Sequence, residues 1–114
     1  MYLLLIIIHK EELLEDVLSC LVELGVTDAV IIDTQSMGKV LAYKVPIFAG
    51  LRFQLGGGRP YSKTILALSE DKNIGEQIAN LLKEVDIDIE VPGTGRIITV
   101  KVESLFGTSE EIPL

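Results

Sequence analysis

The sequence has few of the residues on which enzymatic and metal chemistry most often depends. It contains one cysteine, Cys20, and one histidine, His9, in 114 residues. A single cysteine cannot form an internal disulfide, and the apolar spacing around Cys20 predicts a buried core thiol. A single histidine provides no metal-ligand spacing, so His9 is interpreted as a polar residue at a strand end and we expect no metal. We find neither a Ser-His-Asp nor a Cys-His set, and therefore do not expect an enzyme.

Basic residues are also scarce. Ten Lys and Arg stand against 17 Asp and Glu, which gives a net charge of −7. Such a balance argues against nucleic acid or an anionic membrane as the main partner, although a few local cations could still hold a small phosphate. No apolar run approaches the roughly 20 residues of a membrane span. The N-terminal "MYLLLIII" lacks a basic region and a cleavage site, so it is not interpreted as a signal peptide. We expect a cytoplasmic protein.

What the chain does contain is aliphatic residues in two clear periodicities. Hydrophobic residues make up 48% and aromatic residues only 5%, which predicts one domain, 1–114, with an aliphatic core. Short apolar runs predict strands, and helical spacing predicts helices, the first of which ends at Gly25. The expected strands are 2–8, 28–33, 62–69 and 95–102, and the expected helices are 10–24 and 70–85. The predicted fold class is α+β: a ferredoxin-like βαββαβ sandwich, with a four-stranded antiparallel sheet and two helices on one face.

The segment 36–61 has a different character. It contains three consecutive glycines and two prolines, which predicts a long loop without regular structure. A loop of about 25 residues in so small a domain is usually functional. Its "GGGR", 56–59, is interpreted as flexible loop rather than a phosphate cradle, because no helix is predicted to follow.

The predicted strands are apolar on both faces. Two helices can cover only one face of the sheet, so the other would be a large exposed apolar patch on a monomer. Identical subunits are the simplest cover for such a face. The pattern therefore predicts a homo-oligomer.

The short string "GTGR", 93–96, precedes the last predicted strand. Its two glycines would allow a tight turn and close backbone approach to a ligand, with exposed N–H groups that could form an anion-binding nest, and its arginine could hold a phosphate. The same four residues could equally form a strand-entry turn with a surface arginine, because such strings are weak signals by themselves.

In its order of elements, its long loop and its Gly-x-Gly-basic turn, the chain resembles the nitrogen-regulatory PII signalling family. The strings "GVTDAVIIDTQSMGK", 25–39, and "GTGRI", 93–97, resemble the family's approach to its T-loop and its B-loop. The resemblance implies a homotrimer that binds an adenine nucleotide (ATP, ADP or AMP) between subunits as an effector, with no required cofactor. It also implies that the T-loop regulates a partner protein, such as a membrane transporter or an enzyme.

The resemblance also assigns roles to individual residues. The residues that it implies for nucleotide binding are Ser36, Met37, Gly38, Lys39, Gly93, Thr94, Gly95 and Arg96. Those that it implies for the partner-binding loop are Tyr43, Lys44, Arg52, Phe53 and Arg59.

The chain departs from the family pattern at several positions. Phe53 stands where many members have a tyrosine that is uridylylated, and Val40 stands where a glutamine helps to bind 2-oxoglutarate and magnesium. Gly107 and Ser109 stand where the family has two arginines. The expectation is a divergent PII-like protein that is not uridylylated. Two alternatives remain: a CutA-like metal-tolerance protein, for which few metal ligands are present, and a structural or interaction module of the same fold.

Overall fold

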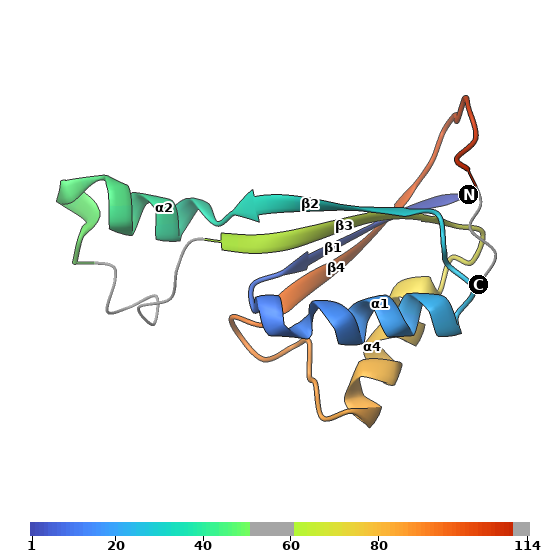
Figure 1. The fold of residues 1–114 in the computed structure, drawn as a ribbon, viewed down its shortest axis with the longest axis horizontal. Coiled ribbons are helices and arrows are strands. Elements are labelled where there is room, and N and C mark those ends of the chain that lie inside the picture. Colours follow the sequence, from blue (N-terminus) through green and yellow to red (C-terminus); the bar gives the residue numbers. More distant parts are fainter. Residues whose placement is uncertain (51–60, 111–114) are drawn as a thin grey trace.

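The computed structural model of the protein describes residues 1–50 and 61–110 and has an α+β fold (Figure 1). The strands are β1 (Tyr2–Ile8), β2 (Ala29–Gln35), β3 (Tyr61–Ser69) and β4 (Gly95–Lys101). The α-helices within the described ranges are α1 (Leu14–Glu23), α2 (Met37–Lys44) and α4 (Ile74–Glu84). Two 3-10 turns, η1 (Glu11–Leu13) and η2 (Pro46–Phe48), precede α1 and follow α2.

The four strands form one antiparallel sheet in the order β2-β3-β1-β4. Both β1 and β2 are antiparallel to β3, so they run in the same direction, and β4 runs opposite to β1. The carboxyl ends of β1 and β2 therefore lie at the same end of the sheet as the amino end of β4. This arrangement is compatible with a ferredoxin-like fold, but the chain also has a third helix, α2, between β2 and β3.

The core lies between the sheet and two helices. Alternate residues of β1, Leu4, Ile6 and Ile8, are buried, as period-two strand geometry requires. Helices α1 and α4 lie side by side on this face (Figure 1), and both contribute buried side chains to the same cluster. The prediction of two helices on one face is confirmed for α1 and α4. Cys20 is buried in this cluster, as expected for a core thiol.

Both core helices end in the same hydrogen-bond pattern. After α1, the N–H of Gly25 donates to the carbonyl of Val22 (3.0 Å) and the N–H of Val26 to that of Leu21 (2.8 Å). Gly25 has φ +76°, which confirms its predicted role as the helix stop. After α4 the corresponding left-handed residue is Asp86, with φ 62°.

The prediction that 36–61 lacks regular structure is wrong for its first part. Residues 37–44 form α2, and Pro46 begins the turn η2. The glycines and prolines on which the prediction depended mostly lie outside "MGKVLAYK", whose Met, Leu, Ala and Lys residues favour a helix. The helix ends before Val45, because a residue that precedes proline is disfavoured in helical conformation. Helix α2 extends beyond the end of the sheet (Figure 1). Residues 51–60, with "GGGR", lie outside the described residues.

The second face of the sheet carries an apolar row that crosses all four strands. Val30, Leu66, Leu5 and Ile98 are consecutive cross-strand neighbours, on the face opposite Leu4 and Ile6. The two ends of the row are well exposed in the single chain, Val30 at 56% and Ile98 at 39%. The strands are thus apolar on both faces, as the sequence predicted.

Candidate anion-binding site

A cavity of about 740 Å³ lies at the end of the sheet where β1 and β2 finish and β4 begins. Its basic side chains come from separate parts of the chain: His9 follows β1, Lys39 lies in the first turn of α2, and Arg96 is the second residue of β4. Residues 89–93, including Glu90, form another wall. The size is typical of small-molecule sites, which occupy roughly 300–1,000 Å³.

The cavity brings together parts of both strings that the sequence predicted for nucleotide binding. Five of the eight expected residues line it. These are Ser36, Lys39, Gly93, Gly95 and Arg96. Of the other three, Met37 is 78% exposed, Gly38 lies within α2, and Thr94 is buried with 4% exposed; none of them lines this cavity.

The "GTGR" turn is held by the fold itself. The N–H of Thr94 donates to the carbonyl of Val91 (3.1 Å), and the carbonyl of Thr94 accepts from the N–H of His9 (3.0 Å). The positive φ belongs to Gly93, at +87°, and a Cβ on Gly95 would lie 2.4 Å from the carbonyl oxygen of Ile7. Gly95 is therefore required by the close approach of β1. The N–H of Thr94 is already used within the turn and is not available to an anion.

The two positively charged side chains of the cavity, Lys39 and Arg96, have no acidic partner in an ion pair among the described residues. Their charge acts on His9, whose pKa is lowered first by burial, then by Lys39 and then by Arg96. Glu90 is the one acidic residue among the described side chains of the lining. An arrangement of this kind attracts an anion.

His9 and residues 89–92 line the cavity but were not among the residues predicted for it. The sequence analysis considered His9 as a metal ligand, for which a single histidine provides no ligand spacing. The available signal was topological: in a sheet where β1 and β2 run in the same direction, the residues that follow both strands lie at one end. A residue just after β1 therefore belongs with Ser36 and Lys39, which follow β2.

A second cavity, of about 670 Å³, lies between α4 and β4. Arg96 and Glu90 line both cavities, so the two adjoin along the start of β4. Asn80 and Thr99 provide hydrogen-bonding groups in the second one. A ligand whose anionic group sits near Lys39 could extend past Arg96 into this space.

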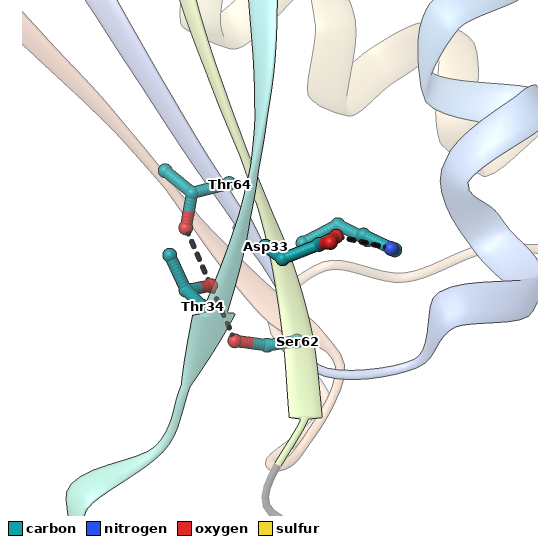
Figure 2. Close-up of polar contacts among 5 residues, drawn as sticks. Asp33, Thr34, Ser62 and Thr64 are labelled. Atoms are coloured by element: carbon teal, nitrogen blue, oxygen red, sulfur yellow. Dashed lines mark hydrogen bonds and ion pairs between the residues drawn. The ribbon is translucent and has the colours of Figure 1, made fainter.

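The end of β2, which leads to α2, is joined to β3 by side-chain hydrogen bonds (Figure 2). Thr34 Oγ1 lies 2.6 Å from Ser62 Oγ and 2.9 Å from Thr64 Oγ1, and these three hydroxyls lie on the face opposite the helices. On the other face Lys63 donates to Asp33, and this hydrogen bond raises the pKa of Lys63. The end of β2 is thereby tied to β3 just before the chain enters the cavity at Ser36.

The residues expected to bind a partner are only partly within the described structure. Tyr43 and Lys44 lie in the last turn of α2, where both are exposed. Arg52, Phe53 and Arg59 lie outside the described residues.

In the described part of the chain, no three or more His, Cys, Asp and Glu side chains are grouped as a metal ion would require. Among the same residues, no helix has the length and apolar character needed to cross a membrane. In comparisons with known proteins, no family model and no curated protein matches this chain.

Proposed function

We propose that the protein is a PII-like signalling protein with a ferredoxin-like βαββαβ core, which binds an adenine nucleotide or a related small anion and regulates a partner protein. Its role is binding rather than catalysis. The single observation that carries the proposal is the cavity in which Lys39 and Arg96, from α2 and β4, stand together without ion-pair partners among the described residues. Uncompensated cations at a partly enclosed site favour a phosphate group through charge-assisted hydrogen bonds.

The size of the two adjoining cavities supports a nucleotide rather than a bare anion. A phosphate between Lys39 and Arg96 would leave the space between α4 and β4 for a larger organic group. Asn80 and Thr99 offer the polar contacts that such a group needs for orientation.

The position of α2 supports a regulatory role. Lys39 lies in the first turn of α2, so a ligand that binds this side chain acts directly on the helix. The helix extends beyond the sheet (Figure 1) and presents the exposed Met37, and the turn η2 that follows it presents the exposed Ile47. A ligand changes partner binding only if it favours one arrangement of this segment over another. The partner is a protein, such as an enzyme or a membrane transporter.

The apolar row on the second face of the sheet supports self-association. Val30, Leu66, Leu5 and Ile98 would leave a contiguous apolar surface in contact with water in a monomer. We propose a homotrimer in which the sheet faces of three copies cover one another and the cavities lie near the subunit boundaries.

The proposal is tested by isothermal titration calorimetry of the untagged protein with ATP, ADP, AMP and cyclic nucleotides. At least one nucleotide should bind. Arg96→Ala should weaken the binding of that nucleotide by about 1.5–3 kcal/mol, or roughly ten- to a hundredfold in affinity. Lys39→Ala should weaken it similarly. The matched control is Lys101→Ala, which removes an exposed cation from the same strand as Arg96 but outside the cavity. The proposed function is wrong if no nucleotide binds, or if Arg96→Ala binds as tightly as the wild type.

A further inference from the structure

His9 occupies a fixed position in the cavity. The backbone N–H of His9 donates to the carbonyl of Thr94 at 3.0 Å. This hydrogen bond joins the residue after β1 to the turn before β4. The side chain is partly buried and lines the cavity together with Lys39 and Arg96. It is thus part of the surface that a bound anion would meet, and it is the only histidine in the chain.

The groups around His9 oppose its protonation in the free protein. Lys39 on α2 and Arg96 on β4 are both positive, and burial further disfavours the charged imidazole, so the pKa of His9 is lowered. Glu90, on the segment before β4, is the acidic group that faces the same cavity. At neutral pH the imidazole of the free protein is therefore mainly neutral.

An anion between Lys39 and Arg96 would reverse this balance. Its negative charge would screen the two cations and favour the imidazolium form directly. A protonated imidazole offers two N–H donors and a positive charge, whereas the neutral form offers one donor. The protonated site therefore has three cations for the ligand in place of two.

We propose that His9 is a ligand-binding residue of this cavity whose protonation strengthens anion binding, so that the affinity of the protein for its anionic ligand rises as pH falls. This inference rests on the proposed function. Protonation of His9 and ligand binding are thermodynamically linked. Protonation increases the affinity of the protein for the ligand by the same factor by which the bound ligand increases the affinity of His9 for its proton. An upward change of one unit in the pKa of His9 on binding corresponds to about tenfold tighter binding to the protonated protein.

The test measures the pKa of the His9 imidazole directly, which is possible because the chain has a single histidine. The His9 ring proton is followed by NMR in untagged protein between pH 4.5 and 9, in phosphate-free buffer, without ligand, with ADP and with sulfate. Sulfate is included because its charge is constant over this range, whereas the terminal phosphate of ADP titrates. Both anions should raise the pKa of His9.

A variant gives a second readout. In His9→Gln the sulfate affinity, measured by calorimetry, should vary less than twofold between pH 5.5 and pH 8, whereas the wild type should bind sulfate several-fold more tightly at pH 5.5. Lys10→Gln, which removes the exposed neighbouring cation, should keep the dependence of the wild type. Circular dichroism confirms that both variants are folded.

The outcomes separate this inference from the proposed function. If ADP or sulfate binds and Arg96→Ala weakens it, but the pKa of His9 is unchanged on binding, the role of His9 is wrong and the anion site stands. If neither ADP nor sulfate binds and no nucleotide of the calorimetric screen binds at any pH, both are wrong.

Discussion

Gly95 is a residue whose identity follows directly from its contacts. A Cβ at this position would lie 2.4 Å from the carbonyl oxygen of Ile7, which is backbone and cannot move aside like a side chain. Gly95→Ala should therefore push β4 away from β1 and reduce the free energy of unfolding by about 1–3 kcal/mol, the usual cost of overpacking. Urea denaturation measures the change. Gly50→Ala is the control, since no atom of the described residues lies within 4 Å of its Cβ position, and it should change stability by less than about 0.5 kcal/mol. Equal stability of the two variants would contradict this account.

His9 should also make the stability of the free protein depend on pH. Its pKa is lowered in the folded state from an unfolded value of about 6.5. The unfolded chain therefore binds this proton more readily, and the free energy of unfolding should decrease as pH falls below about 6.5 until the folded pKa is passed. Urea denaturation at pH 7.5 and pH 5.5 in phosphate-free buffer should show a smaller decrease for His9→Gln than for the wild type. An equal decrease in both proteins would show that His9 does not contribute.

Individual site residues were predictable from the sequence only as two separate strings. The chemistry of Arg96 and Lys39 can be read from their side chains. That both line one cavity depends on strand direction, which places the end of β2 and the start of β4 at the same end of the sheet. The strings also did not distinguish a ligand contact from a structural one. Gly95 was expected to allow close approach to a ligand, whereas its contact is with the backbone of β1.

Helices α1 and α4 differ in the residue that takes the left-handed conformation after their last turn. After α1 the left-handed position is occupied by Gly25, and after α4 it is occupied by Asp86, a residue with a Cβ. The hydrogen bonds are otherwise equivalent: Ile87 N–H donates to Leu82 at 2.9 Å, as Val26 N–H donates to Leu21 at 2.8 Å. The left-handed conformation is less favourable for aspartate than for glycine. The end of α4 is therefore a place where stability can be gained.

Asp86→Gly should raise the free energy of unfolding by about 0.5–1 kcal/mol, because it removes this conformational cost without altering the hydrogen bonds. Gly25→Ala makes the opposite change at the end of α1 and should lower it by about 1 kcal/mol. Thermal or urea denaturation of both variants provides the comparison. If Asp86→Gly is less stable than the wild type, the aspartate side chain has a stabilising role that outweighs its backbone conformation.

The prediction of secondary structure was accurate where the apolar periodicity was strong. It was wrong where it depended on the glycine and proline content of a whole segment. The apolar runs of β1 and β3 and the helical spacing of α1 and α4 lead to the observed elements within a few residues. For 36–61, the glycines and prolines were counted over the whole segment, which concealed the short helix-forming string in α2. Local order along the chain decides such cases, because a proline at 46 limits a helix only from that point onward.

Taken as a whole, the single chain has two unlike sides. One face of the sheet packs on α1 and α4, while the other presents an apolar row that crosses all four strands, from edge strand β2 to edge strand β4. The cavity lined by Lys39 and Arg96 lies with α2 at one end of the same sheet. Association through the open face would thus bring the cavities of several copies close to one another and allow the α2 helices to act together on one partner.

The proposed homotrimer can be tested with a matched pair of substitutions. Val30 and Val22 have similar exposure in the single chain, 56% and 51%, but Val30 lies on the open sheet face and Val22 on α1. Val30→Glu would bury a carboxylate against apolar neighbours in every subunit contact, which costs several kcal/mol and should weaken association by at least about a hundredfold. Light scattering should give the wild type and Val22→Glu about three times the 12.5 kDa chain mass, and Val30→Glu a monomer or a concentration-dependent mixture. A wild-type protein that stays monomeric at micromolar concentration, or a Val30→Glu trimer as stable as that of Val22→Glu, would show that this face is not the interface.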